Sequence, residues 1–209
     1  MANLLDLLHG QLDDNMLDKL SKQIGGADPQ QTATAAQGIL STLVGALAKN
    51  ASTPEGASSL ANALDRDHDG GILDNLMGML GGGGQAQPEQ ARALNGPGIL
   101  KHLLGNNQGG AIDMISNMSG LDQGKTGNLM SMLAPVVMGM LGKEKRQQGL
   151  DIGGLTGLLT NTVSSQKQAG NPLMDMATRF LDKDGDGSAL DDVAGMVGKG
   201  LFSRLFGRK

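Results

Sequence analysis

The chain of 209 residues contains no cysteine, no tryptophan and no tyrosine. The absence of cysteine excludes disulfides, zinc–thiolate centres and thiol catalysis. No apolar run approaches the roughly 18 residues that a membrane-spanning helix needs. The first ten residues also lack the basic start and the small-residue cleavage site of a signal peptide. We therefore expect a soluble protein whose default location is the cytoplasm, with non-classical export left open.

Aromatic residues are scarce as well, since the chain has only Phe180, Phe202 and Phe206. A hydrophobic core must therefore be packed by aliphatic side chains and by 13 methionines, which adapt easily to irregular spaces. The 34 glycines are expected to mark turns, helix caps and close helix–helix contacts. The net charge of −4 lacks the basic surface that a general nucleic-acid binder requires.

Apolar residues recur at helical spacing, which predicts an all-α fold. Asp28-Pro29 and Thr53-Pro54 each place a capping residue before a proline, which is typical of a helix start. The segment 129–141 is apolar nearly all round and is expected to form a central helix. No stretch alternates apolar and polar residues with β-branched side chains, so strands are not expected.

The sequence also repeats itself. A shift of 94 places Gly26-Ala27-Asp28 on Gly120-Leu121-Asp122, and a shift of 117 places Leu64-Asp65 on Leu181-Asp182. We therefore predict two related multi-helix units that arose by internal duplication, each with an EF-hand-like helix–loop–helix. The first unit covers residues 1–80, a Gly/Gln-rich linker covers 81–95, and the second unit covers 96–209 with an insertion at about 144–167.

Two acidic segments stand at matching places in these units. Residues 65–74 read DRDHDGGILD and residues 182–191 read DKDGDGSALD. Carboxylates at alternating positions of a tight glycine-containing loop can converge on a calcium ion, which prefers six to eight oxygen ligands. The sequence thus predicts two Ca²⁺ sites, with another divalent cation left open. The candidate ligands are Asp65, Asp67, Asp69, Gly71 and Asp74, and Asp182, Asp184, Asp186, Ser188 and Asp191, with Gly71 and Ser188 contributing backbone carbonyls.

These loops depart from the EF-hand pattern at their ends. An EF-hand closes with a bidentate Glu at position 12, which is Leu76 or Val193 here. The nearest carboxylates are Asp74 and Asp191 at position 10, so each loop is expected to close there. The alternative is a solvated acidic turn held by Asx-turns. A structural metal that clamps the fold is favoured over a sensor that opens on binding.

The residues that could contribute to a catalytic pattern are His9, His68 and His102, together with the glycine runs. None of the histidines has a nucleophile or a paired acid at a catalytic spacing, and the glycine runs match no phosphate-binding loop. We therefore do not expect an enzyme.

The C-terminal segment, residues 199–209, has the pattern of a basic amphipathic helix. Leu201, Phe202, Leu205 and Phe206 share one helical face, and four basic residues surround it. This pattern fits docking on the protein's own core, insertion into a partner's groove, or a weak contact with a membrane surface.

Several motifs resemble the YidB-like family, a bacterial domain of unknown function. They are Lys49-Asn50-Ala51, Thr53-Pro54-Glu55-Gly56-Ala57, Leu133-Ala134-Pro135 and Gly153-Gly154-Leu155, together with the acidic loops. The resemblance covers nearly the whole chain and implies a compact all-helical fold. It implies no established activity, substrate or catalytic residue.

Taken together, the sequence favours a calcium-binding, non-enzymatic helical module that acts through protein–protein contacts or self-assembly. A membrane-peripheral protein attached by residues 199–209 is the alternative. A nucleic-acid binder with a helix-turn-helix-like arrangement is the weakest reading, because the chain is acidic.

Overall fold

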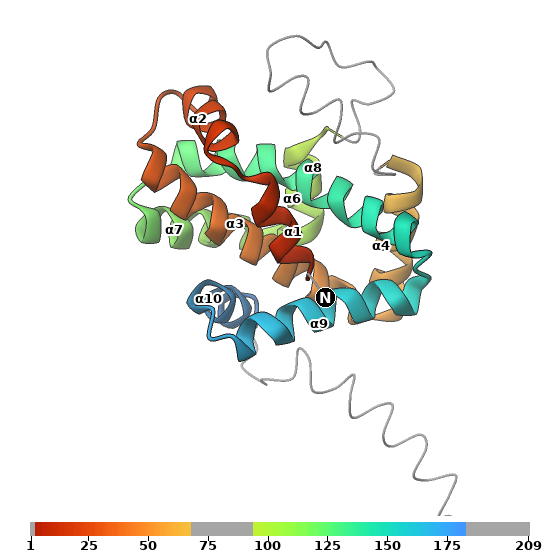
Figure 1. Ribbon diagram of the computed structural model, residues 1–209. Coiled ribbons are helices and arrows are strands. Elements are labelled where there is room, and N and C mark those ends of the chain that lie inside the picture. The colour runs from red at the N-terminus through yellow and green to blue at the C-terminus, as the bar shows by residue number, and fades with distance from the viewer. Residues whose placement is uncertain (1–2, 68–93, 183–209) are drawn as a thin grey trace, which may run out of the picture.

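The computed structural model describes residues 3–67 and 94–182 (Figure 1). Both ranges are helical and contain no β-strand, which confirms the predicted all-α class. The helices are α1 (Leu4–Gln11), α2 (Asp14–Gln23), α3 (Pro29–Asn50), α4 (Pro54–Asp67), α6 (Gly96–Leu104), α7 (Gln108–Ser119), α8 (Gln123–Gln148), α9 (Ile152–Gln168) and α10 (Pro172–Leu181), with a short 3-10 helix at Gly105–Asn107.

Polar caps set the starts of the two longest helices. Asp28 accepts hydrogen bonds from the backbone N–H groups of Gln30 and Gln31, and Pro29 occupies the first turn of α3. Asp122 caps α8 in the same way through the N–H of Lys125, at 2.8 Å. These side chains satisfy N–H groups that have no partner inside the helix. The predicted helix start at Asp28-Pro29 is confirmed.

The centre of the molecule is α3, which contacts most of the other described helices. Every residue from Gly38 to Ala48 is buried, so α3 has no solvent-facing side there. The sequence predicted a central position for 129–141. That part of α8 is also largely buried, and α8 continues through Pro135 as one element. The core is therefore built on two long helices, α3 and α8.

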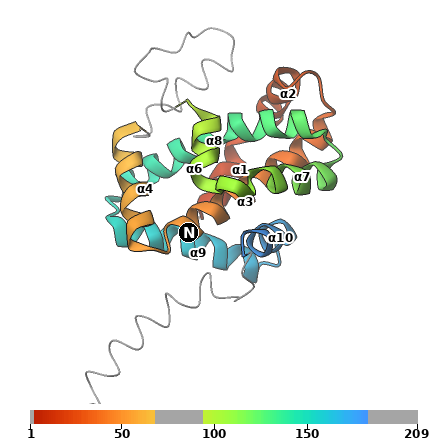
Figure 2. The same cartoon turned by 180° about the vertical axis from the view of Figure 1, so that it is seen from behind.

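The two halves of the sequence share one hydrophobic core. The buried cluster includes side chains from α1, α3, α4, α6, α8, α9 and α10. The largest helix–helix contact joins α10 to α3, whereas α4 packs on α9 and α8. The helix that precedes each acidic segment thus lies on a long helix from the other half. Figures 1 and 2 show α9 running along one edge from α4 to α10, with α4 at the opposite end from α2 and α7.

Similar local hydrogen bonds occur just before and at the start of α3 and α8. Ser21 Oγ donates to the carbonyl of Ala27, and Ser116 Oγ donates to that of Leu121. The hydroxyls of Thr32 and Thr126 both donate to the carbonyl four residues earlier, at 2.9 Å. The two threonines are 94 residues apart, which is the offset found in the sequence, whereas the two serines are 95 apart and donate to carbonyls six and five residues later. The duplication itself stays a prediction. The predicted insertion at about 144–167 covers the end of α8 and nearly all of α9.

No helix in the described ranges has the length and apolar character needed to cross a membrane.

Candidate functional site

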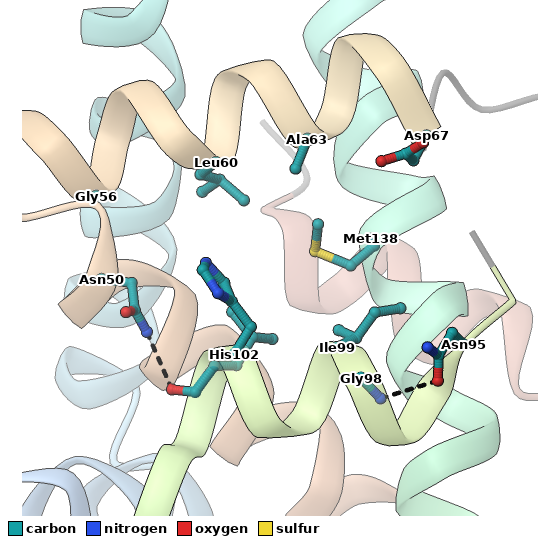
Figure 3. A pocket seen from close by; sticks show the side chains of 11 residues that line it. Asn50, Gly56, Leu60, Ala63, Asp67, Asn95, Gly98, Ile99, His102 and Met138 are labelled. Carbon is teal, nitrogen blue, oxygen red and sulfur yellow. Dashed lines mark hydrogen bonds between the residues drawn. The ribbon is translucent and has the colours of Figure 1, made fainter. Parts of the chain in front are cut away.

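A pocket of about 200 Å³ lies between α4 and α6, with α8 behind it (Figure 3). Its lining is mainly aliphatic, and polar groups stand at its edges. The apolar lining residues are Leu60, Ala63, Ile99, Leu103 and Met138; the others are Asn50, Asp67, Asn95, His102, Gly56 and Gly98. The Met138 side chain of α8 and the His102 imidazole of α6 point into the space below α4.

One end of the pocket is fixed by the turn between α3 and α4. The Asn50 amide donates to the carbonyl of Ala46 at 2.8 Å and to that of Leu103 at 3.1 Å, which ties the end of α3 to the end of α6. Gly56 lies close against this turn, because a Cβ built there would stand only 1.9 Å from the Asn50 carbonyl oxygen. Any side chain at position 56 would push α4 away and change the shape of the pocket.

The other end is fixed by the start of α6. Asn95 caps this helix by accepting a hydrogen bond from the N–H of Gly98 at 3.0 Å. A Cβ on Gly96 would stand 1.8 Å from the carbonyl oxygen of Ser131, so α6 touches the backbone of α8 at this point. The close approach of α6 to α8 positions Ile99 and His102 opposite α4.

The electrostatic character of the pocket follows from its edges. Neither Lys nor Arg belongs to the lining, and Asp67 is its one formally charged residue. The carboxylate of Asp67 lies 3.5 Å from the guanidinium of Arg66. His102 is exposed and has no hydrogen-bond partner among the described residues. The pocket can therefore take an apolar group, with a neutral or positively charged group next to it.

The structure describes three of the predicted metal ligands. Asp65 and Asp67 lie in the last turn of α4, and Asp182 follows α10 as its C-cap. The remaining candidates, Asp69, Gly71, Asp74, Asp184, Asp186, Ser188 and Asp191, lie outside the described residues. Within the ranges that the structure describes, no group of three acidic, His or Cys side chains is placed to hold a metal ion.

The helical course of α4 separates Asp65 from Asp67. Residues two apart on an α-helix are related by a rotation of about 200° about the helix axis, so they lie on nearly opposite sides of the helix. The two carboxylates therefore do not converge in this conformation. Asp65 forms an ion pair with Lys145 near the end of α8, and Asp67 lines the pocket. Lys145 and Asp65 are 80 residues apart in the chain, so no sequence pattern indicated this pair.

A second lysine contacts the end of the helix that precedes the other acidic segment. The ammonium of Lys49, near the end of α3, donates to the carbonyl of Leu181, the last residue of α10. A cation at a helix C-terminus is favourable because the last carbonyls carry partial negative charge. In both halves, then, a lysine near the end of a long helix reaches the start of an acidic segment.

Several residues of the segment 49–57, which carries part of the family resemblance, have structural roles. Besides Lys49 and Asn50, Ala51 accepts a hydrogen bond from Thr156 of α9 at 3.4 Å, and Thr53 caps α4 through the N–H of Gly56 at 3.1 Å. The predicted helix start at Thr53-Pro54 is confirmed. The motif therefore joins α3 and α4 to α6, α9 and α10.

Residues 6–144 match a family model described as bacterial protein of unknown function (DUF937). The chain belongs to the DUF937 family. This result confirms the YidB-like resemblance, and the matched range runs from α1 into α8. In this DUF937 protein, α9, α10 and the second acidic segment lie beyond the matched range. No curated protein and no solved structure matches the chain.

Sequence reasoning did not find the pocket. Its lining comes from α3, α4, α6 and α8 and from the turn before α6, which are far apart in the chain. Helical periodicity predicts which side of a helix is buried, but it could not show that α4 and α6 leave a space between them. His102 gave no signal either, because a single histidine on a helix is ordinary.

Proposed function

We propose that this DUF937 protein is a non-enzymatic helical module that acts through protein–protein contacts or self-assembly, and that it binds a second copy of itself at the pocket between α4 and α6. The observation that carries the proposal is a preformed cavity with an aliphatic lining and a polar edge. Its volume of about 200 Å³ suits one or two bulky apolar side chains. Recognition of an amphipathic helix in an apolar groove is a common mode of protein binding.

The chemistry of the lining supports a binding role over a catalytic one. It offers the His102 imidazole and the Asp67 carboxylate, but none of the lining residues supplies a hydroxyl or a thiol. Covalent catalysis needs a nucleophile within hydrogen-bond reach of a base, and no hydrogen bond joins Asp67 to His102 in the described part of the chain. His102 also has no described partner that would orient its ring, as a general base usually requires.

Filling the pocket tests this function. Ala63 is partly buried and lines the pocket, whereas the neighbouring Asn62 is exposed and does not. We expect the wild-type chain to self-associate in sedimentation velocity, Ala63→Trp to sediment as a monomer, and Asn62→Trp to behave as wild type. Circular dichroism checks that each variant is folded, and Ile99→Ser gives a second pocket variant. A wild-type chain that stays monomeric at all concentrations would contradict the proposal.

We also propose that calcium binds the two acidic segments and stabilises the fold, through the ligands predicted from the sequence. Carboxylate oxygens are the donors that this hard cation prefers. In the described part of the chain, α4 and α10 each lead into one of these segments, and Lys145 compensates the charge of Asp65. Because Asp65 and Asp67 point apart, calcium binding is expected to open the last turn of α4.

Calorimetry on chelator-treated protein tests the metal. We expect heat on calcium addition and a higher melting temperature, since a ligand that binds only the folded state stabilises it. Lys145→Met should tighten binding, because the lysine competes with calcium for Asp65. No heat and no thermal shift at millimolar calcium would exclude the metal without affecting the pocket.

A further inference from the structure

We infer that the partner of the pocket is residues 199–209 of a second copy of this chain, whose Phe202 and Phe206 enter between α4 and α6. This inference rests on the proposed function and names its partner. It predicts a head-to-tail contact between two different surfaces, which lets further copies add to either end of the assembly.

The chemistry of the segment complements the pocket. Residues 199–209 contain two of the three phenylalanines of the chain, four basic residues and no acidic residue. The pocket has an aliphatic lining without Lys or Arg, and it has Asp67 at its edge. Burial of two phenylalanine rings supplies the affinity, and the basic residues add orientation near Asp67, whose charge Arg66 already compensates at 3.5 Å.

Among the described helices, none bridges α4 and α6 across the open side of this pocket. On the other side of the molecule, α9 joins α1 to α10: the Gln166 amide lies 3.4 Å from Asn3 Oδ1 and 3.3 Å from Asp6 Oδ1, and it accepts from Asn171 at 2.8 Å. Among the described helices, α4 and α6 have no such bridge across the pocket, and only α8 lies behind them. An added helix from another copy would complete this side.

The length of the chain permits the contact. Residues 183–209 follow Asp182, and a fully extended chain spans at most about 3.3–3.6 Å per residue. This upper limit leaves room for residues 199–209 of a second copy to reach the pocket. Since the proposed function is contact between proteins, we assign the occupant to a second copy and not to the same molecule.

Mixing two defective variants tests the inference. Ala63→Trp fills the pocket and keeps the tail, and the double variant Phe202→Ser/Phe206→Ser keeps the pocket. We expect each variant alone to be monomeric, with association weakened about tenfold or more. An equimolar mixture should form a one-to-one complex, because each supplies what the other lacks. Ser203→Ala, which lies off the apolar face, serves as a control and should associate as wild type.

The outcomes separate this inference from the proposed function. A mixture that stays monomeric overturns the head-to-tail contact. If the double variant associates as wild type while Ala63→Trp does not, the pocket binds another surface, and only the inference fails. If the wild-type chain never associates, both fail.

A fluorescence measurement remains informative when association is weak. The chain has no Trp and no Tyr, so Phe202→Trp introduces a single emitter. We expect its emission to shift to the blue as the double variant is added, because the ring leaves water for an aliphatic pocket. A blue shift already complete at the lowest concentration would show docking within one molecule and overturn the inference. A shift caused only by vesicles containing phosphatidylserine would assign the segment to membranes, with the same consequence.

Discussion

At the scale of single residues, two glycines fix the distances on which the pocket depends. Gly56 lets α4 begin against the end of α3, and Gly96 lets α6 touch the backbone of α8. Neither glycine has a positive φ, so space alone excludes a side chain at these positions. The obstructing atoms are backbone carbonyl oxygens, which cannot rotate away as a flexible side chain can.

We therefore expect Gly56→Ala and Gly96→Ala each to cost about 2–3 kcal/mol of unfolding free energy, through forced movement of a helix. Gly157→Ala is the matched control, since a Cβ at this position in α9 meets nothing within 4 Å. It should raise stability by up to about 1 kcal/mol through helix propensity. Urea denaturation measures all three, and equal effects at the three positions would contradict the argument.

His9 makes the stability depend on pH. Burial lowers the pKa of His9 below its usual 6.5, and the nearby charge of Asp6 opposes this shift only in part. Its Nε2 is buried and has no hydrogen-bond partner among the described atoms. The unfolded chain therefore binds a proton more readily than the folded chain. The stability due to neutral His9 is complete above pH 6.5 and is lost as pH falls below it.

We expect the unfolding free energy to fall as pH is lowered from 7 through 6, by at most about 1.4 kcal/mol per pH unit for this one group. His9→Gln should flatten this slope, because it removes the titrating group. Thermal melts across this pH range provide the measurement. An unchanged slope in His9→Gln would assign the effect to other groups.

At the scale of helices, the attachment of α1 to α9 depends on a small buried network. Gln166 is only 9% exposed and connects Asn3 and Asp6 of the first helix to Asn171, the cap of α10. The N–H of Leu4 also donates to the Thr162 hydroxyl at 3.4 Å. Loss of one buried partner leaves the others without hydrogen bonds, which costs more than the bond alone.

Gln166→Ala should therefore lower the unfolding free energy by about 1–3 kcal/mol and reduce the hydrogen-exchange protection of α1 more than that of α3. Gln168→Ala, at an exposed position of the same helix, should change stability by no more than about 0.5 kcal/mol. Hydrogen exchange read by mass spectrometry distinguishes the helices. Equal loss of protection in α1 and α3 would show that α1 has no separate stability.

At the scale of the whole molecule, α3 and α8 join the two sequence halves in one core. Leu43 and Leu141 are completely buried, one in each half, and both belong to the same hydrophobic cluster. Helix α10 of the second half packs on α3 of the first half, and α4 of the first half packs against α8 of the second half. Neither half therefore encloses its own long helix. The two predicted units should therefore not be separable in solution.

We expect Leu43→Ala and Leu141→Ala each to cost about 2–5 kcal/mol and to shift one common unfolding transition. Peptides from α3 and from α8 should lose hydrogen-exchange protection at the same urea concentration in each variant. If either substitution instead unfolds only the half of the chain that contains it, the two halves are independent domains.

The sequence by itself determined the class of the fold, the starts of α3 and α4 and the family. These depend on local chemistry: a proline after a capping side chain, apolar residues at helical spacing, and a short motif read along the chain. Tertiary structure alone decided the pocket, the ion pair of Lys145 with Asp65 and the single core. Each depends on residues distant in sequence and on how closely two helices approach, and periodicity along one chain contains no measure of that distance.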